Sequence, residues 1–231
     1  MHPGQQTSED DLAADLRGFG PLAIIATVII LLTGNIVLPN MVALPIGAIL
    51  VLIWARLSRT PWKEIGYVKP KNWTATITVG IVFGIAFKFA MKAIVMPLFG
   101  ADPVNRSYHF LAGNKTLLPL AVCAMLVAGF GEETVFRGFM FERLSKLLGT
   151  GRAAKISIVV VTSAWFALSH YFNQGWTGVE QAAITGLVFG SIFAATKMIW
   201  MIMVAHAFFD LTALAMIYWN VEPTIAHLIF K

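Results

Sequence analysis

The sequence predicts an all-α fold, a polytopic bundle of about seven transmembrane helices, from its composition, its apolar runs and its charge distribution. Of the 231 residues, 58% are hydrophobic and only 13% are charged. A soluble domain is nearer to half apolar and one quarter charged. Most basic residues lie between the apolar runs, and none of their clusters is a long basic run. This pattern favours orientation in a lipid bilayer over nucleic-acid binding.

The N-terminal residues differ from the rest of the chain in composition. Residues 1–20 are polar and carry an acidic cluster, which consists of Glu9, Asp10, Asp11 and Asp15. No basic segment precedes an apolar one here, so the pattern is not that of a cleaved signal peptide. We expect a mobile polar tail at residues 1–20, followed by one transmembrane domain at residues 21–231.

The expected spans follow from runs of roughly 20 apolar residues. We place them at residues 21–38, 42–58, 75–97, 117–147, 154–172, 181–196 and 198–219. The fourth is too long for one straight crossing and contains Gly129 and Gly131. We expect it to bend at these glycines or to run on into the interface.

The orientation follows from the distribution of lysine and arginine. In a chain of seven spans, the basic connectors 56–71 and 143–155 and the loop at Lys197 share one face with the N-terminus. The loops of the opposite face carry only Arg106 and Lys115. The positive-inside rule therefore predicts a cytoplasmic N-terminus and an external C-terminus. We expect a multi-pass protein of the bacterial plasma membrane.

Three charged residues interrupt the fourth apolar run. Ionisable groups at membrane depth are costly and are functional hypotheses by default. Glu133 and Arg137 are four residues apart, so they share a helix face and can form an ion pair. Glu132 is rotated by about 100° from Glu133 and points elsewhere. The alternative is a solvated patch of all three residues at the membrane interface.

Two further polar intrusions lie in later spans. His170 closes the fifth span, one helical turn after Phe166. His206 and Asp210 are four residues apart inside the last span, where a carboxylate can fix the tautomer of an imidazole. The alternatives are an interfacial histidine at position 170 and a polar pair that holds helices together at positions 206 and 210.

The three intrusions in this order resemble the motifs of the CPBP family of intramembrane peptidases, also called the ABI or CAAX-protease family. The motifs read Glu-Glu-x-x-x-Arg, then Phe-x-x-x-His, then His-x-x-x-Asp, each in a separate span. The family includes the type II CAAX prenyl endopeptidase, and the resemblance covers about residues 115–220. The family commonly has Asn at the last position, where this chain has Asp210, which puts a role as neutral amide donor in doubt.

The resemblance implies an intramembrane endopeptidase that hydrolyses membrane-associated proteins or peptides, CAAX-type or lipidated ones included. In this family the first glutamate and the second-motif histidine position a water, here Glu132 and His170. The histidine and Asn of the last motif form the oxyanion site, here His206 and Asp210. The supporting residues are then Glu133, Arg137 and Phe166. The chemistry agrees, because a glutamate at low dielectric can act as a base on water and imidazoles can stabilise an oxyanion.

A zinc site is the alternative within the same activity. Two histidines and one or two carboxylates can hold Zn²⁺ with an open position for water. The ligands would be His170, His206, Asp210 and Glu132. The chain lacks His-Glu-x-x-His, in which base and ligands are adjacent. We favour catalysis by glutamate without a metal or another cofactor.

Two other classes of function remain open from the residues. A proton-coupled transporter also uses intramembrane Glu, His and Asp, but we find no inverted repeat. A membrane scaffold or immunity-type protein could retain protease residues without turnover. Lys88 and Lys92 share a face of the third span. We expect both to snorkel to an interface, or alternatively to attract a carboxylate of the bundle or of a substrate C-terminus. We expect Ala101 to Phe110 to be an exposed loop.

Overall fold

The computed structural model describes residues 3–35 and 40–230, with side chains described over 8–33 and 45–230. These residues contain helices and no strand, which confirms the predicted all-α fold. The α-helices are α1 Pro3–Arg17, α2 Pro21–Asn35, α3 Asn40–Leu57, α4 Trp73–Ala90, α5 Met96–Leu98, α6 Leu118–Glu133, α7 Phe141–Leu148, α8 Arg152–Ser169, α9 Tyr171–Thr196, α10 Trp200–Tyr218 and α11 Glu222–Ala226. Two π-helical segments, η1 Met91–Val95 and η3 Thr134–Met140, and a short 3₁₀ helix, η2 His109–Leu111, complete the described part.

Five helical stretches of the described chain are long and apolar enough to cross a membrane. They are Trp73–Leu98, Leu118–Leu148, Arg152–Ser169, Tyr171–Thr196 and Trp200–Tyr218. Ser8–Arg17 and Pro21–Thr33, bent by 54°, give a sixth when taken together, whereas Pro45–Leu57 is shorter than a span. The chain is therefore an integral membrane protein with five or six candidate spans by this criterion. Each of the seven expected spans coincides with a helix, and the end of the first, at residues 36–38, lies outside the described residues.

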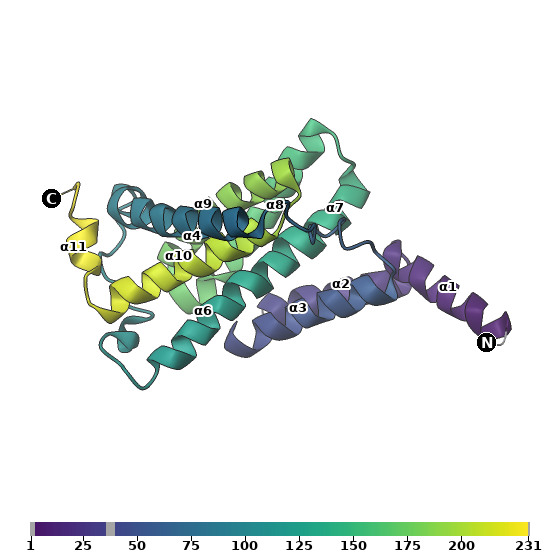
Figure 1. Cartoon of the computed structure of the whole chain (residues 1–231), viewed down its shortest axis with the longest axis horizontal. Helices are drawn as coiled ribbons and strands as arrows, with labels where there is room; N and C mark the ends of the chain where they lie inside the picture. The colour runs from purple at the N-terminus through teal and green to yellow at the C-terminus, as the bar shows by residue number, and fades with distance from the viewer. Residues whose placement is uncertain (1–2, 36–39, 231) are drawn as a thin grey trace.

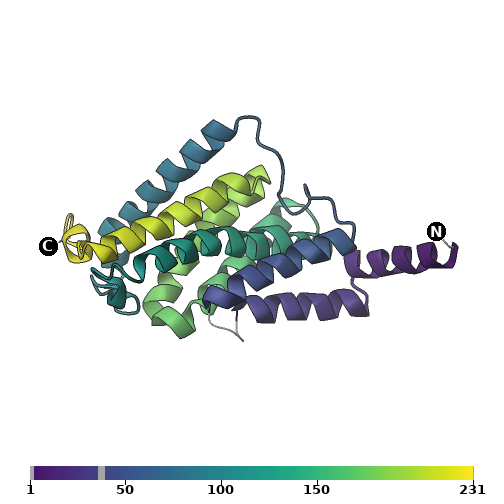
Figure 2. The same ribbon diagram turned by 60° about the horizontal axis from the view of Figure 1, so that its bottom comes forward.

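Helix α10 lies at the centre of the bundle, between α4 and α6 (Figures 1 and 2). Helices α8 and α9 pack against each other, and α3, which packs against α2, also packs against α6. The two ends of the chain lie at opposite ends of the long axis (Figure 1). This arrangement surrounds the polar residues of α6 and α10 with apolar helices on several sides.

The N-terminal segment, expected to be a mobile tail, forms helix α1, and its last turn is anchored to the bundle. The guanidinium of Arg143 donates to the carbonyls of Arg17 and Gly18 at 2.9 and 2.8 Å. The indole of Trp54 donates to the carbonyl of Leu16 at 3.0 Å. Carbonyls at a helix C-terminus lack partners within the helix, so these donors cap α1.

Helix α9 starts ten residues earlier than the expected sixth span. It begins at Tyr171, directly after α8, and is interrupted at Gly175, where φ is 62° and ψ is −160°. A backbone with this positive φ favours glycine, because a side chain there would be strained. The apolar pattern of residues 171–180 is too irregular for the sequence to reveal a helix with such a break.

Candidate active site

Glu132, Glu133 and Arg137 lie where the fourth span changes from α-helical to π-helical geometry. Both glutamates end α6, and Arg137 belongs to η3. The expected fourth span is one helical stretch from Leu118 to Leu148, which widens to π-helical geometry at Thr134, shortly after the two glycines. Such π segments inside α-helices occur frequently at functional sites. All three charged side chains are buried, which excludes the solvated interfacial patch.

The predicted pair of Glu133 and Arg137 is formed. Arg137 Nη1 lies 3.0 Å from Glu133 Oε1, and the two side chains are 1% and 0% exposed. Arg137 Nη2 also donates to the carbonyl of Gly186 at 3.2 Å, and the guanidinium lies 4.9 Å from the ring centre of Phe166. The guanidinium therefore joins α9 and α8 to η3 through buried contacts.

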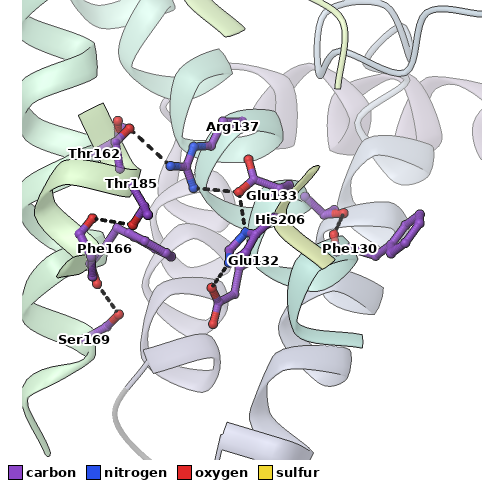
Figure 3. A network of polar contacts seen from close by, with 12 residues as sticks. Phe130, Glu132, Glu133, Arg137, Thr162, Phe166, Ser169, Thr185 and His206 are labelled. Atoms are coloured by element: carbon purple, nitrogen blue, oxygen red, sulfur yellow. Dashed lines mark hydrogen bonds and ion pairs between the residues drawn. The ribbon is translucent and has the colours of Figure 1, made fainter. Parts of the chain in front are cut away.

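His206 connects both glutamates to α10 (Figure 3). Its Nδ1 lies 2.7 Å from Glu133 Oε1, the same oxygen that accepts from Arg137. Its Nε2 lies 3.6 Å from Glu132 Oε2 and also 3.6 Å from Asp210 Oδ2. A carboxylate at one ring nitrogen fixes the orientation of the imidazole. Glu133 therefore holds the ring so that Nε2 faces Glu132 and Asp210. The hydrogen bond between His206 and Glu133 was not predicted from the sequence.

The Phe-x-x-x-His motif also has a structural basis. Nδ1 of His170 lies 2.8 Å from the carbonyl of Phe166 one turn earlier. A carbonyl only accepts, so Nδ1 carries a proton and, in the neutral ring, Nε2 keeps its lone pair. The ring of Phe166 contacts both histidines, with its centroid 4.7 Å from that of His170 and 5.9 Å from that of His206.

Close approach of backbones sets the position of His206. A methyl group on Gly129 of α6 would lie 2.5 Å from the backbone nitrogen of Ala207. One on Gly84 of α4 would lie 2.2 Å from the carbonyl oxygen of Ala205. Backbone atoms cannot yield as a flexible side chain can, so both neighbours of α10 require glycine here. The residue between these two contacts is His206.

A cavity of about 290 Å³ brings the expected site residues together. Glu132, His170, His206 and Asp210 all line it, whereas Glu133 and Arg137 do not. Its volume is near the lower end of the roughly 300–1,000 Å³ of small-ligand sites. The geometry therefore separates the four expected catalytic residues from two of their expected supports. Polar lining residues that were not among the expected site residues include Lys88, Tyr108 and Gln181.

Tyr108 reaches the cavity from the segment between α5 and α6, which the sequence presents as an exposed loop. Its burial, together with the carboxylates of Asp210 and Glu132, raises the pKa of the Tyr108 hydroxyl. The hydroxyl accepts a hydrogen bond from Gln174 Nε2 at 3.5 Å. Tyr108 therefore presents a neutral hydroxyl group to the cavity. In the sequence, the only signal for Tyr108 was that an aromatic residue stands between two polar ones, Ser107 and His109.

The expectation that Lys88 and Lys92 snorkel to an interface is wrong. Both ammonium groups are buried. Lys92 Nζ forms an ion pair with Glu222 Oε1 of α11 at 2.9 Å, as the alternative expected. Lys88 Nζ donates instead to Gln181 Oε1 of α9 at 2.8 Å.

A metal site needs several His, Cys, Asp or Glu side chains close enough together to bind one ion. Within the described residues, no group of three or more His, Cys, Asp or Glu side chains has the arrangement to hold a metal ion.

Comparison with known families gives one result. Residues 114–212 match the family model for Rce1-like type II CAAX prenyl endopeptidases. The match confirms the resemblance found in the sequence, and its range includes all three motifs. No curated protein and no solved structure matches the chain.

Proposed function

We propose that this chain, whose residues 114–212 are Rce1-like, hydrolyses peptide bonds within the membrane by a water that Glu132 activates. The family match supports a CAAX-type intramembrane endopeptidase in general. The observation that supports the specific mechanism is the cavity that Glu132, His170, His206 and Asp210 all line. Its walls are mostly apolar, as suits a peptide that arrives through the bilayer.

The proposed reaction begins with a water between Glu132 and His170. Glu132 takes a proton as the water oxygen attacks the scissile carbonyl carbon, and Nε2 of His170 accepts the second hydrogen bond of that water. Glu132 then delivers the proton to the leaving nitrogen as the C–N bond breaks. The products are one peptide with a new carboxylate and one with a new amine.

The oxyanion that forms in this reaction requires hydrogen-bond donors. His206 donates from Nε2 in its doubly protonated form, with Glu133 as the counter-charge at Nδ1. Asp210 can take the place of the family's Asn amide only while its carboxyl group holds a proton. Tyr108, whose hydroxyl is neutral, is a further donor in the same cavity.

The test is cleavage by full-length protein in proteoliposomes, with and without a zinc chelator. The probes are dansylated peptides that end in a cysteine followed by three apolar residues, one with S-farnesyl cysteine and one without. We expect cleavage, and we expect the chelator to change its rate by less than about twofold, because a glutamate base needs no metal. If the protein instead holds one zinc per chain, and removing that zinc reversibly abolishes activity, His170, His206 and Asp210 would be reassigned as zinc ligands. Absence of cleavage of both peptides, beside intact binding, would favour the scaffold function.

We further propose that the N-terminus is cytoplasmic. The basic connectors share one end of the bundle with α1, because Arg143 caps α1 and Ile199 donates to the carbonyl of Gly66 at 3.0 Å. The cavity is lined by residues of the opposite end, Tyr108 and Gln174 among them. This placement gives the active site access from the external side.

The orientation is tested by labelling single cysteines with a membrane-impermeant maleimide, after replacing the native Cys123 by serine. We expect Gln174→Cys to react in right-side-out vesicles and Ser145→Cys only in inverted ones. The reverse pattern would overturn the positive-inside interpretation.

A further inference from the structure

Lys88 places a buried ammonium group in the wall of the proposed active site. The side chain is 6% exposed, and its residue lies within the apolar span Trp73–Leu98. Its Nζ donates to Gln181 Oε1 at 2.8 Å and lies 4.7 Å from the ring centre of Phe209. An ammonium group has three N–H donors, so these contacts leave it with unused hydrogen-bonding capacity.

Lys88 differs from the other buried cations of the described part of the chain. Each of the others forms an ion pair with a buried carboxylate. The pairs are Arg137 with Glu133, Lys92 with Glu222 and Arg143 with Glu142. No ion pair of Lys88 with a carboxylate is formed among the same residues. A charge at membrane depth without such a partner is costly and marks a functional position.

The surroundings of Lys88 suit an anionic ligand. Because Oε1 of Gln181 faces Lys88, the amide NH₂ of Gln181 is left to donate beside the ammonium. Both residues line the same cavity as Glu132 and Asp210. The two lining carboxylates attract the ammonium from a distance, but Lys88 makes its direct contacts with an amide and an aromatic ring.

We propose that Lys88, with Gln181, binds the C-terminal carboxylate of the peptide substrate. This inference rests on the proposed function, because it requires that the cavity receives a peptide. Three extended residues span about 10 Å, so a scissile bond near Glu132 can lie only a few residues from a carboxylate held in the same cavity. The chain would then cleave close to free C-termini and discriminate against internal bonds. Lys88 is in this view a specificity residue that takes no part in the chemical step.

The test compares two peptides that differ only at the C-terminus. Both are the dansylated farnesyl peptide described above, one with a free carboxylate and one with a carboxamide. Charge-assisted hydrogen bonds favour the acid, so we expect wild-type kcat/KM to be about 10- to 100-fold higher for the acid. In Lys88→Met the ratio should fall to about one, and Lys88→Arg should restore part of it because the charge is kept.

Lys115→Met is the matched control, since Lys115 is exposed and lies outside the cavity. Its ratio should equal that of the wild type. If Lys88→Met loses the same factor on both peptides, so that the ratio persists, Lys88 has a structural role and the inference is overturned.

Binding separates this inference from the proposed function. Should wild type cleave neither peptide, the proposed function fails, and the affinities of the same two peptides decide the role of Lys88. Tighter binding of the acid that disappears in Lys88→Met supports the carboxylate site, whereas equal affinities of wild type for both peptides overturn it.

Discussion

Glu132→Gln is expected to abolish peptide cleavage in a protein that stays folded. The substitution keeps the shape and polarity of the side chain but removes the base that takes the proton from water. Loss of a general base alone lowers the rate by roughly 100- to 10,000-fold. Glu132 contacts His206 only at 3.6 Å and makes no buried ion pair with Arg137, so the fold does not depend on its charge.

The measurement is cleavage of the farnesyl peptide beside thermal unfolding in detergent. Glu64→Gln is a suitable control, because Glu64 does not line the cavity and pairs with Arg17 near the surface, where such pairs contribute little. More than a tenth of wild-type turnover in Glu132→Gln would show that another group activates the water. The same variant distinguishes an enzyme from a scaffold, since a scaffold would keep its biological effect.

The local parts of the site could be predicted from the sequence. Glu133 and Arg137 pair because residues four apart share a helix face, and this holds even where the helix widens into η3. His170 donates a hydrogen bond to the carbonyl of Phe166, also four residues away. These contacts depend on helix geometry alone. The order of the three motifs supplied the resemblance to the CAAX-protease family, which the match of residues 114–212 to the Rce1-like model confirms.

The contacts between helices could not be predicted. The bond from His206 to Glu133 depends on how closely α10 approaches α6, which Gly129 sets through contact with the backbone of Ala207. Lys88 meets Gln181 from a position 93 residues away in the chain. Periodicity carries no information about which helix faces which.

The N-terminal helix shows the same limit. Residues 3–17 have no apolar face strong enough to predict docking. Their last turn is held by donors from distant residues, Trp54 and Arg143. A polar segment can therefore be ordered by partners that its own sequence does not reveal.

Glu133→Gln is expected to lose both stability and turnover, which corrects the simplest interpretation of the sequence. If Glu133 only supported Arg137, activity would fall in proportion to the folded fraction. The structure gives Oε1 of Glu133 two partners, Arg137 at 3.0 Å and His206 at 2.7 Å. Leaving a buried guanidinium without its carboxylate typically costs about 3–5 kcal/mol. Loss of the carboxylate that orients a catalytic histidine lowers turnover further, by about tenfold or more per folded molecule.

A double variant separates the two roles of Glu133. In Glu133→Gln/Arg137→Met the unpaired cation is gone, and replacing both partners of a buried pair is far milder than removing one. We therefore expect thermal stability to recover toward that of the wild type, while turnover per folded molecule stays low because His206 still lacks its carboxylate. Thermal unfolding in detergent and cleavage of the farnesyl peptide, measured on both variants, test this. Recovery of turnover together with stability would mean that Glu133 acts only through Arg137, and the contact with His206 would then have no part in catalysis.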